Sequence, residues 1–167
     1  MKYFITAILM LFAICRTNAQ DIFSYAKTGN IEGVSQYKND INSKNTEGYT
    51  PLILAVYHNH YKVAKWLLDN GAQPDLQDQS GNTALMGATF KGYKEMISLL
   101  ISYKVNVNMK NYNEATALIY AAVFSKTEII KLLLENGADK NAKDNRGNTA
   151  LKHAQMQNNE EAVKLLQ

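Results

Sequence analysis

The sequence predicts an all-α solenoid, a row of stacked helix–turn–helix units joined by finger-shaped loops. The first observation is a phrase that occurs twice, because residues 70–85 and 136–151 are identical at nine of sixteen positions. The second is a weaker copy halfway between them, at 103–118. The third is a threonine that recurs at equal intervals along the chain, as Thr50, Thr83, Thr116 and Thr149. A period held over three intervals indicates a repeat array.

The unit that begins at Thr50 carries the signals of two short helices. Thr50 can cap the first helix through its hydroxyl, and Pro51 suits the first helical position, where no amide donor is needed. Apolar residues follow at helical spacing, first Leu52, Ala55 and Val56, then, after a polar turn, Val63, Trp66, Leu67 and Leu68. Gly71 follows the second helix, where a left-handed residue commonly ends a helix, and a polar finger leads to the next threonine. Two such helices cannot bury their apolar faces alone, so the units are expected to stack.

The N-terminus has the three-part layout of a secretory signal peptide, which we expect to span residues 1–19. Lys2 supplies the early cation, residues 3–15 form an apolar run, and residues 17–19 form a small-residue cleavage site before Gln20. The alternatives are a buried first helix and a membrane anchor. The apolar run has about thirteen residues, which is short for a hydrocarbon core of about 30 Å.

Cleavage would leave a mature chain, residues 20–167, of nearly balanced charge. The full sequence has 18 Lys and Arg residues against 15 Asp and Glu, a net charge of +3. Without Lys2 and Arg16 the net charge becomes +1, which gives no argument for binding nucleic acid or anionic membranes. The only cysteine, Cys15, would also leave, so disulfides and thiolate sites are not expected. A lipid anchor on Cys15 is disfavoured because Ile14, not a small residue, precedes it.

The repeated unit resembles the ankyrin repeat. TPLILAV at residues 50–56, VAKWLL at 63–68 and NGA at 70–72 follow that family's Thr-Pro-Leu opening, apolar second helix and Gly-Ala ending. The resemblance covers about residues 21–167. It implies an N-terminal cap repeat at 21–49, full repeats at 50–82, 83–115 and 116–148, and a truncated C-terminal cap repeat at 149–167. Together with the signal peptide, it indicates an exported ankyrin-repeat protein of bacterial type.

The family's histidine after Leu is missing from every copy, and its place is taken by Ile53, Met86, Ile119 and Lys152.

The third unit departs most from the pattern. Lys104 replaces the helix-ending glycine, Glu114 replaces the finger glycine, and Gly87 lies inside a first helix. Each swap should cost about 0.5–1 kcal/mol. We expect the ring of Tyr120, which stands one repeat after Gly87, to fill the space that this glycine leaves.

No set of residues predicts catalysis, a metal or a cofactor. His58 and His60 lie two apart in a turn, where solvated imidazoles are expected, and His153 lies on the first helix of the last unit. The finger carboxylates are expected to cap local turns; these are Asp75, Asp78, Asp139 and Asp144. Nucleophile elbows, phosphate loops and metalloprotease helices are missing from the sequence.

The residues that differ between copies are the candidates for function. Resemblance to the family places variable binding positions at the finger tips and at the ends of the first helices, on the concave side. The candidate partner-binding residues are Tyr49, Tyr57, His58, Asn82, Phe90, Lys91, Tyr112, Asn113, Phe124 and Arg146. Aromatic residues are enriched among them, as in protein interfaces. The alternative is that some of these rings turn inward and pack between fingers.

These observations predict a non-catalytic, monomeric module that binds another protein in the periplasm or outside the cell. The partner could be an enzyme of the same compartment, a toxin that the module neutralises as an inhibitor or immunity protein, or a host protein. An enzyme with a site built from the fingers is the competing class, but the sequence offers no nucleophile–base pair or metal set for it. Nucleic acid is a weaker alternative because no basic stripe is present.

Overall fold

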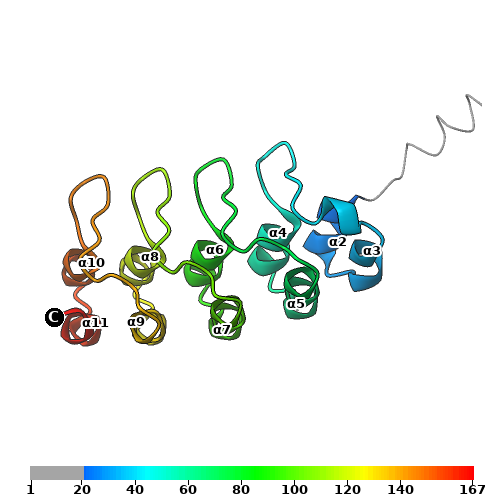
Figure 1. Cartoon of the computed structure of the whole chain (residues 1–167). Coiled ribbons are helices and arrows are strands. Elements are labelled where there is room, and N and C mark those ends of the chain that lie inside the picture. Colours follow the sequence, from blue (N-terminus) through cyan, green and yellow to red (C-terminus); the bar gives the residue numbers. More distant parts are fainter. Residues whose placement is uncertain (1–20) are drawn as a thin grey trace, which may run out of the picture.

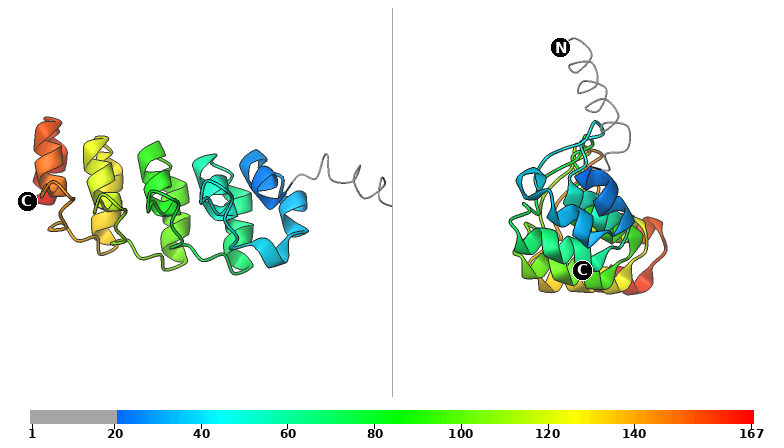
Figure 2. Two further views of the ribbon diagram at one scale, coloured as in Figure 1. Left: turned by 90° about the horizontal axis from the view of Figure 1, so that it is seen from above. Right: turned by 90° about the vertical axis from the view of Figure 1, so that its right-hand side faces the viewer.

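The computed structural model describes residues 21–167, so the predicted signal peptide lies outside the described residues. Figure 1 shows two rows of helices with fingers rising above the upper row. The upper row consists of α2 (Ile22–Thr28), α4 (Pro51–Tyr57), α6 (Ala84–Lys91), α8 (Ala117–Val123) and α10 (Ala150–Met156). The lower row consists of α3 (Ile31–Ser35), α5 (Tyr61–Asp69), α7 (Lys94–Ser102), α9 (Thr127–Glu135) and α11 (Glu160–Leu166), and a 3-10 turn, η1 (Lys38–Asp40), follows α3. The predicted all-α solenoid is confirmed, and the two views in Figure 2 show its stacked pairs.

The recurrent threonines begin the upper-row helices as the sequence predicts. The hydroxyl oxygen of each threonine accepts a hydrogen bond from the backbone amide three residues on, as Thr50 does from Ile53 at 3.2 Å. Pro51 occupies the first turn of α4. Such caps satisfy amides that the helix itself leaves unpaired. One threonine in each unit therefore sets both the start of a helix and the end of a finger.

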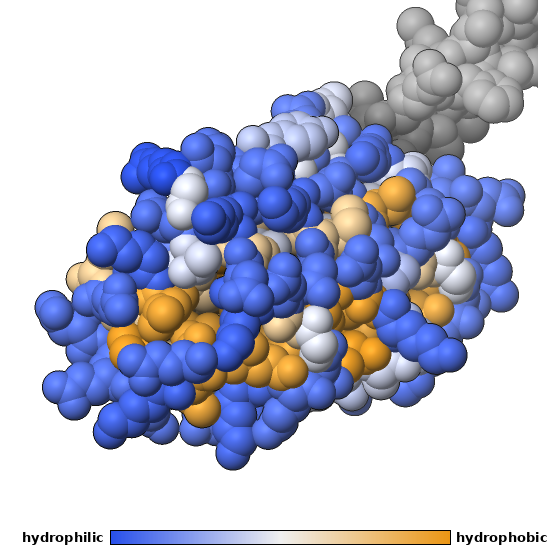
Figure 3. Space-filling view, turned by 60° about the vertical axis from the view of Figure 1, so that its left-hand side comes forward, coloured by the Kyte–Doolittle hydropathy of each residue, from blue (hydrophilic) through white to orange (hydrophobic). Residues whose placement is uncertain are grey.

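The core runs the length of the stack between the two rows. Ala55, Ala88, Ala121 and Ala154 stand at the same position of successive units and are fully buried. These small side chains let neighbouring upper-row helices approach closely, while the leucines and isoleucines of the lower row cover them. On the face shown in Figure 3, apolar residues are visible along the middle of the stack with hydrophilic residues on either side.

Left-handed backbone ends the lower-row helices α5, α7 and α9, as expected. Gly71 and Gly137 have φ values of 94° and 83°, and Lys104 takes the same place with φ 58°. Glu114 likewise has φ 57° in the third finger, where Gly81 has 78°. The turns between paired helices also use this conformation, at Asn59, Gly92, Ser125 and Asn158. Side chains with a Cβ pay a steric cost at such positions.

Side chains at one recurrent position tie each lower-row helix end to the neighbouring unit. Asn42 Oδ1 accepts from Gln73 N, and its amide donates to Gly71 O; Asn108 repeats both bonds with Asp139 N and Gly137 O. Asp75 accepts from Asn106 N at 3.0 Å, but a carboxylate cannot donate to the carbonyl of Lys104. The expectation that Asp75 caps a local turn is therefore wrong, because the amide that donates to it lies in the following unit. The third unit thus combines a strained residue, Lys104, with a link that lacks one of the two hydrogen bonds.

Lys104→Gly should raise the free energy of unfolding by about 0.5–1 kcal/mol, because glycine adopts the observed backbone without steric cost. A urea midpoint measures the change. Gly137→Ala is the matched control in the opposite direction. A Cβ at Gly137 would meet no atom within 4 Å, so its expected loss of stability comes from the backbone alone. A midpoint for Lys104→Gly at or below that of the wild type would contradict the prediction.

Candidate functional site

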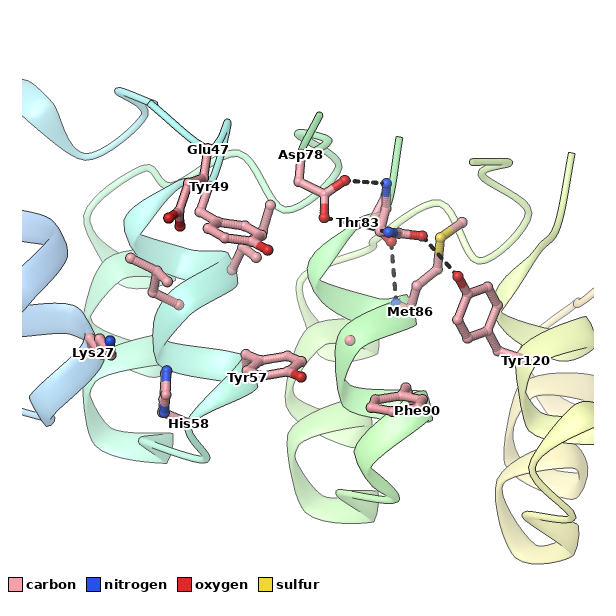
Figure 4. Close-up of a pocket in the computed structure, with 14 residues that line it drawn as sticks. Lys27, Glu47, Tyr49, Tyr57, His58, Asp78, Thr83, Met86, Phe90 and Tyr120 are labelled. Carbon is pink, nitrogen blue, oxygen red and sulfur yellow. Dashed lines mark hydrogen bonds between the residues drawn. The ribbon is translucent and has the colours of Figure 1, made fainter. Parts of the chain in front are cut away.

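A groove runs between the fingers and the ends of the upper-row helices. Its first cavity, of about 430 Å³, lies between α4 and α6 (Figure 4) and is lined from above by finger residues and from below by Tyr57 and Phe90. A second cavity, of about 550 Å³, continues beside α8 and α10, between Arg146 and Phe124. Tyr120 lines both cavities and separates them. The structure therefore brings the two predicted rows of positions, finger tips and helix ends, to one surface.

The helix-end aromatics line the lower edge of the groove in three successive units. Tyr57, Phe90 and Phe124 are exposed to 41%, 38% and 41%. The ring centroids of Phe90 and Phe124 lie 4.8 Å apart in an edge-to-face arrangement. Lys91 Nζ lies 4.2 Å from the centroid of the Tyr57 ring, within the range of a cation–π contact. The row is thus partly packed and partly open to a partner.

A hydrogen-bonded network, which we call the Asn82–Asn111–Tyr120 network, holds the wall between the two cavities. Asn111 is 3% exposed, and its amide donates to Asn82 Oδ1 at 2.9 Å and to the Tyr120 hydroxyl at 3.1 Å. Tyr120 in turn donates to Asn82 Oδ1 at 3.1 Å. Burial raises the pKa of the Tyr120 hydroxyl, which keeps it protonated as a donor. Sequence reasoning missed Asn111, although an Asn or Asp recurs at this place in every finger, at positions 45, 78, 111 and 144.

The ring of Tyr120 does not fill the space beside Gly87, contrary to the expectation. A Cβ added at Gly87 would have only Tyr57 Cδ2 within 4 Å, at 3.8 Å. The Asn82–Asn111–Tyr120 network holds the Tyr120 hydroxyl at the finger bases, so its ring forms a wall of the first cavity. The space at Gly87 therefore stays open.

The two turn histidines differ in environment. His58 is exposed, whereas His60 is half-buried, lies against Gly29 and donates from Nε2 to the carbonyl of Lys27 at 2.9 Å. The expectation of a solvated turn is wrong for His60, because the N-terminal unit packs over it. Burial, followed by repulsion from Lys27, lowers the pKa of His58. His58 thus faces the first cavity as a neutral imidazole at neutral pH.

Family models for ankyrin repeats match more than half of the chain. The model described as "Ankyrin repeats (3 copies)" matches residues 70–144 and 105–167, and the one described as "Ankyrin repeats (many copies)" matches residues 36–88. The chain belongs to the ankyrin-repeat family. Comparison with curated proteins gave no match. Ankyrin repeats are generally protein–protein interaction modules and are typically non-catalytic.

The remaining predicted binding positions of this ankyrin stack differ in how exposed their side chains are. Tyr112 is 71% exposed at a finger tip and lies against Gly81 of the preceding finger. Asn113 and Arg146 are exposed and line the second cavity. Tyr49 is half-buried against the core, which fits the alternative of an inward ring, although it also lines the first cavity. Asn82 lines that cavity too, but its oxygen is occupied by the Asn82–Asn111–Tyr120 network.

Three finger carboxylates of the described residues cap turns and do not gather into a metal site. Between residues 21 and 167, no group of three or more His, Cys, Asp and Glu side chains could hold a metal ion. Asp78, Asp139 and Asp144 accept backbone amides of their own fingers, so they cap turns as predicted. None of the helices described in this range is long and apolar enough to cross a membrane.

One acidic finger residue also pairs with a histidine of the last unit. His153 Nε2 lies 2.7 Å from Asp144 Oδ2, and the two side chains are only 15% and 9% exposed. Burial alone would raise the pKa of the Asp144 carboxyl. Hydrogen bonds from His153 and from the backbone amides of Asn148 and Arg146 outweigh it and hold the pKa below its usual value. The pair braces the last finger against α10.

Acid should weaken this brace. Because the folded-state pKa of Asp144 lies below its unfolded value of 3.8, its stabilisation is present above that value and is lost as the pH falls through the folded pKa. The Asp144→Asn variant should therefore be less stable than wild type at neutral pH and lose less stability on acidification. Urea midpoints measured from neutral pH downwards test this. Parallel curves for the two proteins would contradict it.

Proposed function

We propose that this ankyrin stack binds a partner protein through the groove between its fingers and helix ends. The observation that carries the proposal is the exposed aromatic row beside an open cavity. Eight large apolar side chains are exposed among the described residues, and four of them, Tyr57, Phe90, Phe124 and Met156, line the groove. Aromatic anchors that meet a partner's pockets commonly supply most of the affinity of an interface.

Affinity capture tests the proposal. Immobilised residues 20–167 should retain one protein species from extracts of the source cells and their medium, and soluble residues 20–167 should compete it off. Retention that is unaffected by the soluble competitor, or no retention at all, would contradict the proposal. If the captured protein is an enzyme or a toxin, loss of its activity on binding would favour the inhibitor or immunity role over a scaffolding role.

We also propose that binding takes place outside the cytoplasm, in the periplasm or in the medium. The signal layout of residues 1–19 and the single cysteine, placed within it, support this setting. The expected result is a mature protein that begins at Gln20. N-terminal sequencing of the protein purified from a bacterial host measures this, and an intact Met1 in the cytosolic fraction would refute it.

A further inference from the structure

Gly87 occupies a position that does not need glycine. It lies inside α6, where the equivalent residues of the other units are Leu54, Tyr120 and His153. Its φ lies outside the left-handed region, and a Cβ there would meet its nearest atom at an ordinary contact distance of 3.8 Å. Glycine weakens a helix relative to alanine, so neither the backbone nor the packing accounts for this choice. Its effect in the structure is to keep the first cavity open.

The cavity beside Gly87 has an apolar lining and fixed walls. Ile53 and Met86, both buried, contribute apolar surface beside Gly87, and Tyr57 and Phe90 lie at its lower edge (Figure 4). Tyr120 closes the far side and is held there by its hydrogen bonds. A volume of about 430 Å³ exceeds that of any single side chain, so a large aromatic or aliphatic group could enter without displacing the walls.

The charges at the edges of the cavity are separated. Glu47 and Asp78 lie on the finger side, whereas Lys27 lies on the helix-end side together with the neutral His58 (Figure 4). Asp78 is occupied by the backbone amides of Ser80 and Asn82. Glu47 is exposed, and its carboxylate makes no hydrogen bond or ion pair with any residue in the described range. The finger side therefore presents an acidic group ready to pair with a cation.

We propose that the cavity receives a large apolar side chain from an extended segment of the partner protein, and that Glu47 pairs with a basic residue two positions away on that segment. This inference rests on the proposed function and specifies the chemistry of the partner. Alternate residues of an extended chain lie about 7 Å apart on one face, which allows one segment to supply both groups. Gly87 and Glu47 would then determine specificity.

A peptide library tests the proposal without knowledge of the partner. Random twelve-residue peptides displayed on phage are selected on residues 20–167, and enriched sequences are synthesised and titrated by fluorescence anisotropy. We expect the enriched peptides to carry a large apolar residue with Arg or Lys two positions away. Selections that enrich nothing, or only sequences without this pair, would overturn the proposal.

Substitutions at Gly87 that fill the cavity should affect peptide binding and folding stability differently. Gly87→Ala should raise the melting temperature, because alanine favours the helix, yet weaken the selected peptide. Gly87→Leu should weaken it by about tenfold or more, as expected when an anchor loses its pocket. If Gly87→Leu proves unstable, the alanine variant alone decides. Unchanged peptide affinity in the alanine and leucine variants would overturn the proposal.

The role of Glu47 is tested with paired changes. Glu47→Gln should weaken a peptide that carries the basic residue by about threefold to tenfold, and should leave its Arg→Ala or Lys→Ala version unaffected. Glu95→Gln, on the exposed side of α7, is the matched control. Equal loss for both peptides would overturn the ion pair. If the captured partner still needs Phe124 but binds Gly87→Leu normally, the groove remains the binding site and only the pocket assignment fails.

Discussion

Asn111→Ala should lower the free energy of unfolding by about 3 kcal/mol, the largest loss of stability that we expect from a single finger residue. The Asn111 side chain, 3% exposed, accepts from the amides of Asn113 and Ala115 and donates to Asn82 and Tyr120. Its removal leaves the buried amide of Ala115 and the partly buried amide of Asn113 without this acceptor, and the Asn82 oxygen and the Tyr120 hydroxyl each lose a donor. A buried polar group without a hydrogen bond costs about 1–3 kcal/mol.

Asn45→Ala is the matched control, because Asn45 occupies the same place in the first finger. Its oxygen accepts only the backbone amides of Glu47 and Tyr49, and its side chain is less deeply buried. A loss of about 1 kcal/mol is expected there. Chemical denaturation of both variants measures the difference. Equal losses would show that the bonds to Asn82 and Tyr120 add nothing, and that the wall between the two cavities is held by packing alone.

The helical architecture could be predicted because its signals are local. The Thr50 hydroxyl accepts a hydrogen bond from an amide three residues away, and Gly71 adopts the left-handed backbone that ends its own helix. Both signals recur with the period, so each copy supports the interpretation of the others. Lys104 supports the use of the period: it stands where Gly71 and Gly137 stand in their units, and it adopts the same left-handed backbone, with φ 58°, although it is not a glycine.

The contacts between units could not be predicted in the same way. Tyr120 bonds to Asn82, 38 residues away, and His60 to Lys27, 33 residues away. The residue types show that these groups can form hydrogen bonds, but not which of several neighbours they meet. The sequence therefore predicts that Tyr120 lies near Gly87. In the structure, hydrogen bonds to Asn82 and Asn111 hold the Tyr120 ring away from Gly87. The space beside Gly87 is left open as a result.

The aromatic row should contribute strongly to partner binding and weakly to folding. Tyr57→Ala, Phe90→Ala and Phe124→Ala should each weaken the captured partner by about 1–2 kcal/mol or more where the ring is an anchor. Because each ring is about two-fifths exposed and Phe90 also packs on Phe124, the free energy of unfolding should fall by only about 1 kcal/mol. Titration of the partner and thermal melting of each variant give the two quantities.

Tyr61→Ala provides the control for this comparison. Tyr61 is exposed to a similar extent, 43%, but belongs to α5 in the lower row and lines neither cavity of the groove. Its loss should change melting as little as the groove variants do and leave partner affinity unchanged. Losses of about 3–5 kcal/mol in folding for all three groove variants would place their rings in the core. Normal melting with unchanged affinity in the three groove variants would show that the partner binds another face. Loss of affinity in Tyr61→Ala would show that the binding face includes α5.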